Sequence, residues 1–195
     1  MFNYYPRHKP KNETKILELG FGSGCNLWFC AKEGFNCYGI EGSSFAVNHA
    51  KEWFLRENLF PVYLQQSLFY PLDFQSNFFD LVIDRSSLTC VNTNECLASL
   101  KEVHRVLKPE GYFCFNPFST KHTSYLEGDL LDSGLTQFKS DSFLKVDNLK
   151  FYNEEELYKL ILAAGFKIYE MKHIEEKFYT PENIIHAEWF LILGK

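Results

Sequence analysis

Short apolar runs alternate with helically spaced apolar residues along most of the chain. Continuous apolar runs favour strands that are buried on both faces, whereas spacings of three and four residues favour amphipathic helices. The segments predicted to be strands are 15–19, 36–40, 61–65, 78–84, 112–116, 166–171 and 187–193, and those predicted to be helices are 23–33, 43–58, 93–107 and 153–164. This alternation predicts an α/β fold with helices on both faces of a mostly parallel sheet.

Residues that start and stop helices lie at the ends of these segments. Ser43 or Ser44, and Asn153, are suited to cap helix N-termini, because their side chains accept hydrogen bonds from free backbone N–H groups. Gly34 and Gly165 follow helical patterns, where a glycine commonly ends the helix. The predicted helix boundaries therefore agree with the apolar spacing.

Two regions depart from the alternation. The last two predicted strands have no helix between them, so we expect an antiparallel hairpin with a charged loop near 175–183. Residues 117–149 show no strong helix or strand pattern, and a loop this long in a compact domain is commonly functional. Because it follows the fifth strand, we expect it at the carboxyl edge of the sheet as a lid over a substrate. We treat 1–195 as a single domain that carries this insertion.

A glycine-rich turn carries the strongest chemical signal. Gly20, Gly22 and Gly24 follow a predicted strand and lead into a predicted helix. Glycines there permit a tight turn and let the backbone approach a ligand closely. The second strand ends at Glu41, about twenty residues further on, where an acidic side chain accepts hydrogen bonds from ribose hydroxyls. Nicotinamide dinucleotides and S-adenosylmethionine both bind this arrangement.

Three features favour S-adenosylmethionine. The glycine spacing is G-x-G-x-G, whereas the dinucleotide fingerprint is G-x-G-x-x-G. Glu18 precedes the turn, where its charge would repel a pyrophosphate and attract a sulfonium or ammonium ion. The chain also lacks room for the separate substrate domain that most dehydrogenases carry. An NAD(P)-dependent oxidoreductase is the alternative enzyme, and a non-catalytic domain that binds a cofactor or a partner is the other alternative.

The chain resembles the class I, or Rossmann-like, S-adenosylmethionine-dependent methyltransferases. Residues 16–24 resemble their first motif, Glu41 matches their ribose-binding acid, 79–84 resemble their fourth-strand motif and 105–112 resemble their turn into strand five. The resemblance implies a three-layer α/β/α fold with a seven-stranded sheet whose last strand is antiparallel. It also implies methyltransferase activity, with S-adenosylmethionine bound across the carboxyl ends of the first four strands.

The same resemblance implies which residues bind the cofactor. Glu18 and Asp84 would face its methionine part, and Glu41 would hold the ribose. Ser67 stands where the family commonly has Asp against the adenine amine, and Leu68 would pack on the ring. The predicted cofactor-binding residues are Glu18, Gly20, Gly22, Gly24, Glu41, Gly42, Ser67, Leu68, Asp84 and Arg85.

The acceptor is predicted to be a small molecule. Residues 84–87 stand where enzymes that methylate nucleic-acid amino groups carry Asn-Pro-Pro-aromatic, and the net charge is -5, so a nucleic-acid partner is not expected. Holding the nucleophile in line with the methyl group in a dry site supplies much of the catalysis. His122 is the candidate general base, which is needed only if the acceptor is protonated. Tyr125 and Arg85 are the candidate substrate-binding residues.

Composition and cysteine usage leave this interpretation in place. The first residues are polar, and no run approaches the roughly twenty apolar residues of a membrane span, so we expect neither a signal peptide nor a membrane partner. The six cysteines form no C-x-x-C pair and no metal-ligand spacing, which predicts no metal and a reduced, cytoplasmic setting. We expect a monomer or weak homodimer. Tyr4 and Tyr5 could form a short cap over the cofactor.

Overall fold

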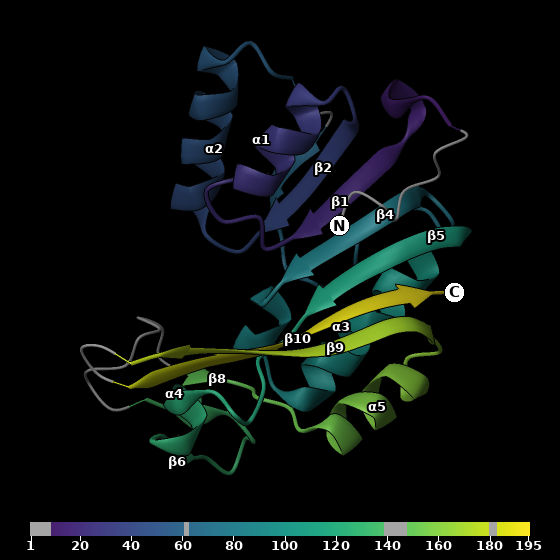
Figure 1. The fold of residues 1–195 in the computed structure, drawn as a ribbon. Coiled ribbons are helices and arrows are strands. Elements are labelled where there is room, and N and C mark those ends of the chain that lie inside the picture. The colour runs from purple at the N-terminus through teal and green to yellow at the C-terminus, as the bar shows by residue number, and fades with distance from the viewer. Residues whose placement is uncertain (1–8, 61–62, 139–147, 180–182) are drawn as a thin grey trace.

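One seven-stranded sheet forms the centre of the molecule in a computed structural model that describes residues 9–60, 63–138, 148–179 and 183–195 (Figure 1). Its strand order is β3-β2-β1-β4-β5-β10-β9. The strands are β1 (Lys15–Leu19), β2 (Asn36–Glu41), β3 (Tyr63–Gln66), β4 (Phe79–Arg85), β5 (Leu107–Asn116), β9 (Lys167–Phe178) and β10 (Ile184–Gly194). The helices are α1 (Cys25–Lys32), α2 (Ser44–Arg56), α3 (Thr93–Val106) and α5 (Glu154–Ala163), with shorter elements η1 (Lys11–Glu13), η2 (Ser87–Cys90) and α4 (Thr123–Leu126).

The pairing of the strands confirms the predicted fold class. β3, β2, β1, β4 and β5 pair in parallel. β10 lies between β5 and β9 and is antiparallel to both. The chain order reverses between β1 and β4, where open α/β sheets bind ligands outside the carboxyl ends of their strands.

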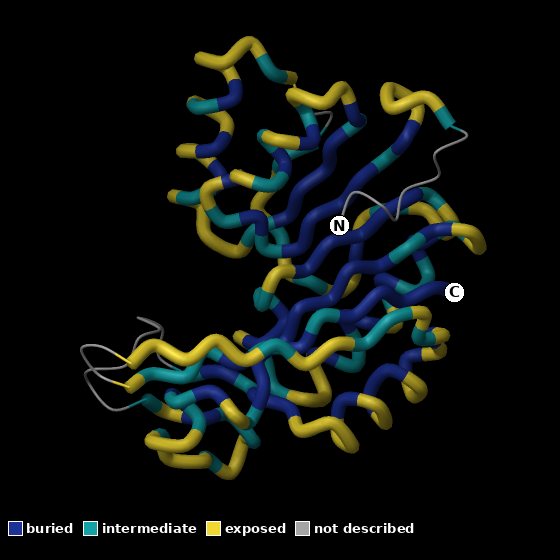
Figure 2. The backbone as a smooth tube through the Cα atoms, viewed as in Figure 1, coloured by how far each residue is buried: buried dark blue, intermediate teal, exposed yellow. Residues whose placement is uncertain are grey.

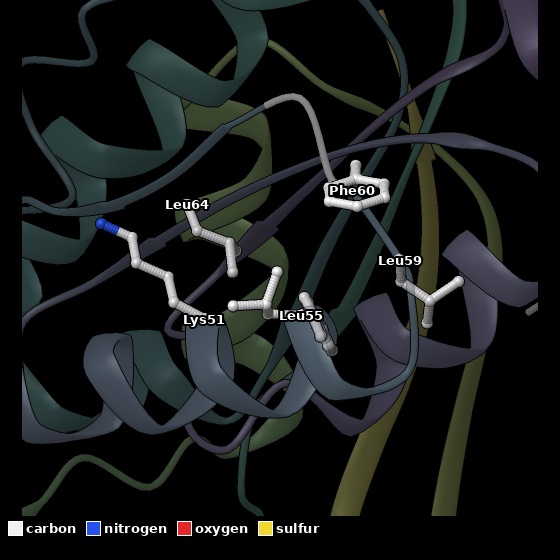
Figure 3. A pocket seen from close by; sticks show the side chains of 6 residues that line it. Lys51, Leu55, Leu59, Phe60 and Leu64 are labelled. Atoms are coloured by element: carbon white, nitrogen blue, oxygen red, sulfur yellow. The ribbon is translucent and has the colours of Figure 1, made fainter.

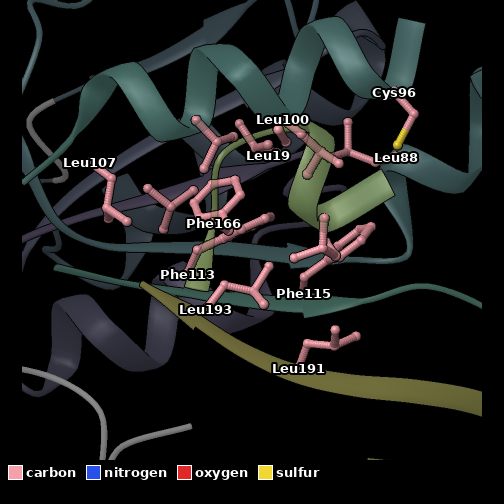
Figure 4. Close-up of a cluster of buried hydrophobic side chains, with 14 of the residues drawn as sticks. Leu19, Leu88, Cys96, Leu100, Leu107, Phe113, Phe115, Phe166, Leu191 and Leu193 are labelled. Carbon is pink, nitrogen blue, oxygen red and sulfur yellow. The ribbon is translucent and has the colours of Figure 1, made fainter. Parts of the chain in front are cut away.

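Helices cover both faces of the sheet, as the sequence pattern predicts. Neighbouring residues of one strand contribute to opposite cores, because side chains alternate across a strand. Ile16 packs with the α1 and α2 side, and Leu17 with the α3 and α5 side. Figure 2 shows the central strands as the buried part of the molecule. Figure 4 shows Phe113 and Phe115 of β5 beneath α3.

The helix caps agree with the sequence analysis. Ser43 caps α2, with its hydroxyl accepting from the Ala46 N–H. Asn153 caps α5 in a capping box, in which its side chain and that of Glu156 accept from each other's backbone N–H groups. Gly34 and Gly165 have positive φ just after α1 and α5, which is the usual conformation of a helix-ending glycine. A second capping box, at Asn92, starts α3.

The structure corrects two local predictions. The segment 175–183, predicted as a charged loop, continues β9 to Phe178, and β10 already begins at Ile184, so the hairpin is longer than expected. The insertion 117–149, predicted to be irregular, contains α4 and the strands β6 (Asp129–Leu130), β7 (Thr136–Gln137) and β8 (Asn148–Leu149), which form a small antiparallel sheet. Tyr4 and Tyr5 lie outside the described residues, as does the stretch 139–147.

An apolar hollow of about 290 Å³ lies between α2 and the edge strand β3 (Figure 3). It is lined by Lys51, Phe54, Leu55, Leu59, Phe60 and Leu64. None of these residues is among those predicted to bind the cofactor.

Three further observations concern the described part of the chain. No helix there is long and apolar enough to cross a membrane. No group of three or more metal-ligating side chains is found among the described residues. All six cysteines are free thiols.

Candidate functional site

The glycine-rich turn connects β1 to α1 at the carboxyl edge of the sheet. Gly20, Gly22 and Gly24 have φ of 60°, 55° and 90°, which is the left-handed region that side-chain-bearing residues rarely adopt. The N–H of Gly20 donates to the Ile40 carbonyl at 2.8 Å, which ties the turn to β2. A Cβ at Gly22 would meet no atom within 4 Å, so this side of the turn is open.

Glu41 is the last residue of β2, and its side chain holds the glycine-rich turn in place. One carboxylate oxygen accepts from the Gly22 N–H at 2.9 Å, and the other accepts from the Ser43 N–H at 2.9 Å. Each carboxylate oxygen has a further acceptor position. A Cβ at Gly42 would also meet nothing within 4 Å. Glu41 is therefore positioned both to order the turn and to accept hydrogen bonds from a ligand.

Two buried acids lie at the ends of β1 and β4. Glu18 is 2% exposed and Asp84 is 0% exposed, and Leu19 pairs with Asp84 in the sheet. Asn26 donates to one Glu18 oxygen at 2.6 Å, and the Leu88 N–H donates to one Asp84 oxygen at 3.0 Å. Glu18 Oε2 and Asp84 Oδ2 are buried without a hydrogen-bond partner. Burial raises the pKa of Glu18 to about 8 and that of Asp84 to about 7.

The segment after β3 lies beside the same edge. The Ser67 N–H donates to the Glu41 carbonyl at 3.0 Å, so the main chain there continues beside β2. The Ser67 hydroxyl donates to the Leu68 carbonyl at 3.1 Å, and the Leu68 side chain is 75% exposed. Both predicted adenine-side residues are thus at the expected edge.

The end of β4 is held by its neighbours. Ser86 has a φ of 63°, and its hydroxyl donates to the Asn116 carbonyl at the end of β5 at 2.8 Å. The Ser87 hydroxyl donates to the Leu19 carbonyl at 2.8 Å, which links η2 to the glycine turn. Arg85 is exposed at this edge.

His122 is fully buried. Its Nδ1 accepts from the Ser124 N–H at 3.1 Å as the cap of α4, so the neutral ring carries its proton on Nε2. That Nε2 lies 3.3 Å from Nδ1 of His186, whose Nε2 is 3.6 Å from a Glu188 carboxylate oxygen. Burial, together with the neighbouring His186, lowers the pKa of His122 to about 4. The ring is therefore neutral at pH 7.

Tyr125 lies in the small core of the insertion. Its ring is 5.6 Å from that of Phe151, and both belong to a cluster with Phe118 and Leu149. The Lys150 N–H, directly after the insertion, donates to the Thr89 carbonyl at 2.7 Å, so the end of the insertion docks on η2 after β4. The predicted substrate-binding residue is thus packed against other aromatic rings of the same cluster.

Sequence reasoning missed the partners that hold this site together. Glu18 is bound by Asn26, which is 8 residues away in the sequence. The end of β1 is bound by Ser87, 68 residues away, and His122 is bound by His186, 64 residues away. Asn26 lies two residues after Gly24, in the first turn of α1, which is a local signal that could have found it. The other two contacts cross between elements, and no spacing rule reveals them.

Comparison with known proteins identifies the fold and the family. The family model described as a methyltransferase domain matches residues 17–115, about half of the chain. No curated protein sequence matches the chain. Among solved structures, an S-adenosylmethionine-dependent methyltransferase from Methanosarcina mazei is 22% identical, with a TM-score of 0.80, over 100% of this chain and 95% of that one.

Two other similar structures are of interest for their acceptors or partners. One of them is described by the conversion of a disulfide bond into a thioacetal group during echinomycin biosynthesis. It is 18% identical, with a TM-score of 0.71, over 93% of this chain and 76% of that one. A putative methyltransferase from Haloferax volcanii, in complex with the Trm112 methyltransferase activator, is 16% identical, with a TM-score of 0.71, over 95% of this chain and 83% of that one.

Proposed function

Because this chain belongs to the methyltransferase domain family, with the class I fold and S-adenosylmethionine as its cofactor, we propose that it methylates a small-molecule acceptor. The observation that supports the site best is the cradle formed by the open turn at Gly22, the Glu41 carboxylate and the buried acids Glu18 and Asp84. It lies at the reversal of the sheet order, where this fold binds ligands.

The residues of this cradle fit the chemistry of the cofactor. Glu18 and Asp84 each carry a buried oxygen without a partner, which suits a positively charged methionine part. Glu41 has acceptor positions for ribose hydroxyls, and the open turn accommodates a ligand close to the backbone. When bound, S-adenosylmethionine supplies a methyl group activated by its sulfonium. The protein orients this group and excludes water from it.

A small-molecule acceptor is supported by charge and by the insertion. The net charge of -5 disfavours a phosphate backbone as partner. The insertion docks on η2, which follows β4, and this supports Arg85 and Tyr125 as the residues that contact the acceptor. A structural relative is itself described by the conversion of a disulfide bond into a thioacetal group during echinomycin biosynthesis. Tritiated methyl transfer to pools of thiols, sugars and other metabolites tests this proposal, and labelling of nucleic acid alone would contradict it.

Glu41→Ala is expected to weaken S-adenosylmethionine binding by about 1–3 kcal/mol, because the ribose and the Gly22 N–H both lose their acceptor. Calorimetric titration measures the affinity. Glu52→Ala, which removes an exposed acid of α2, is the matched control and should bind as the wild type does. An unchanged affinity in Glu41→Ala would show that the ribose is held elsewhere.

The same titration with NADH tests the oxidoreductase alternative. Tight binding of NADH, with no response to S-adenosylmethionine or its demethylated product, would overturn the proposed function.

For His122 we propose a positioning role rather than direct contact with the acceptor. Its buried ring caps α4 and orients His186, so a side chain that does both should replace it. We expect His122→Asn to keep turnover within about threefold, because an amide accepts from Ser124 and donates to His186. His122→Ala should lower the melting temperature. A loss of about 10²–10⁴ in kcat for His122→Asn would restore His122 as the general base.

The setting and assembly of the protein also belong to this proposal. Six free thiols support a reducing compartment, and we place the protein in the cytoplasm. We continue to predict that the protein is a monomer or a weak homodimer. The Haloferax volcanii relative is in complex with an activator protein, and for this chain the acceptor is the partner that we propose.

A further inference from the structure

Glu18 and Asp84 are two buried carboxyl groups whose negative charges are not balanced by nearby positive charges. They lie near the carboxyl ends of the neighbouring strands β1 and β4, on opposite faces of the sheet, and the negative charge of Asp84 contributes to the raised pKa of Glu18. Each has one oxygen without a hydrogen-bond partner, and both side chains are more than nine-tenths buried. A buried carboxylate without a counter-charge is costly, so such a pair either holds a proton or awaits a cation.

The groups around Glu18 that favour its ionised form are hydrogen-bond donors and one positively charged side chain. Asn26 of α1 donates to it, and the neighbouring Leu27 N–H and the charge of the exposed Arg85 of β4 also lower its pKa. Cys37 of β2 faces it as a thiol whose pKa is raised by Cys30 and by burial, so it is neutral. Burial still outweighs these favourable contacts, and the pKa of Glu18 is about 8.

The surroundings of Asp84 are similar. The Leu88 N–H donates to it, and the neighbouring Ser86 and Ser87 also lower its pKa, but burial outweighs them and gives a pKa of about 7. The titratable groups whose charges couple to Asp84 are Cys90, Cys96 and Tyr152, besides Glu18. The pKa values of these thiols and of the phenol are raised, so all three are neutral at pH 7 and offer no positive charge.

We propose that Glu18 and Asp84 recognise the charge of the methyl donor by exchanging a proton with solvent. The pair releases the proton when the positively charged sulfonium donor binds, and a proton returns when the neutral thioether product remains. Donor and product both carry an ammonium group and differ by the sulfonium charge. The pair would therefore favour the donor over its own product. This inference rests on the proposed function, because it takes S-adenosylmethionine as the ligand.

The sign of the pH dependence follows from this exchange. The cation binds best to the ionised pair, and protonation competes with it, so donor affinity rises with pH until both acids are ionised. We expect the donor Kd to fall about tenfold from pH 6 to pH 7 and to level off above pH 8. Product affinity should change less than threefold over the same range, so the preference for the donor grows with pH.

The experiment is calorimetric titration of the protein with S-adenosylmethionine and with S-adenosylhomocysteine between pH 6 and pH 8.5. At pH 7 it is repeated in two buffers with different ionisation enthalpies, which counts the protons released on binding. We expect about one proton released per donor and less than half a proton per product. Equal proton release for the two ligands, or a donor preference that does not change with pH, would overturn the inference.

Asp84→Asn tests the role of the pair with little change in shape. The amide oxygen still accepts from the Leu88 N–H, but the side chain no longer ionises. We expect proton release to fall by more than half, the donor preference to fall about tenfold and product affinity to stay within threefold. Glu110→Gln, which removes an exposed acid from β5, is the charge-matched control and should behave as the wild type does.

Two safeguards separate the possible outcomes. If Asp84→Asn melts well below the wild type, Glu18→Gln replaces it, because Gln keeps the contact with Asn26 and also cannot ionise. Failure of the wild-type protein to bind either ligand at any pH would overturn the proposed function, and this inference with it. Binding of both ligands with equal proton counts would overturn the inference alone.

Discussion

Gly22→Ala is expected to lower the affinity for S-adenosylmethionine about 10- to 100-fold while leaving the protein folded. The turn is open at Gly22 in the protein itself, so a methyl group there meets no protein atom. It would instead occupy the space through which the backbone approaches the ligand, and overpacking of this kind costs about 1–3 kcal/mol. Calorimetric titration and thermal unfolding measure the two effects separately.

Two other glycines with positive φ give matched controls. Gly34→Ala has equal room and a φ of 89° far from the site, so it should cost only about 1 kcal/mol of stability and leave binding unchanged. Gly20→Ala would place its Cβ in collision with the Ser87 hydroxyl, so we expect it to cost about 1–3 kcal/mol of stability beyond the loss in Gly34→Ala. The interpretation of the cradle fails if Gly22→Ala binds as tightly as Gly34→Ala.

Phe113→Ala is expected to destabilise the protein by about 3–5 kcal/mol, which is a large part of a typical free energy of unfolding. Phe113 is 0% exposed, stacks on Phe115 with ring centroids 5.4 Å apart, and lies 5.5 Å from the ring of Phe166. Truncation leaves a cavity between β5 and its covering helices. Urea unfolding followed by circular dichroism gives the free energy.

Phe45→Ala is the matched control for Phe113→Ala. The Phe45 side chain on α2 is 80% exposed, so the same chemical change should cost less than about 0.5 kcal/mol. Similar losses in the two variants would mean that the core does not depend on the position of Phe113.

The central strands were predictable because burial on both faces leaves a plain apolar run. β1 and β4 were predicted as strands for this reason, and the glycines locate the turn after β1. The outer half of β9 was not predictable in this way. Glu175, Glu176 and Lys177 belong to a strand that extends past the main sheet with exposed side chains, and their polarity is typical of a loop. The two-residue strands of the insertion are too short to show any period.

The cofactor side of the candidate site was predictable in outline, whereas its acceptor side was not. Glu18, Gly22 and Glu41 come together because the carboxyl ends of parallel strands meet at one edge. The burial of Asp84, and the absence of a partner for its Oδ2, follow from packing by β5 and η2, which the pattern of a single strand does not report. His122 shows the same limit, since its burial depends on a strand 64 residues away.

The position of β10 has a consequence for how the protein is made. The outer side of β5 has no partner strand until β10 is synthesised, and Leu191, Ile192 and Leu193 are fully buried there. During translation, β1, β2, β4 and β5 leave the ribosome first and expose an apolar sheet edge in the nascent chain. Such an edge is a template for aggregation and a target for chaperones. Ribosome-bound intermediates ending before residue 184 should therefore depend on chaperones for solubility, whereas the full chain should not.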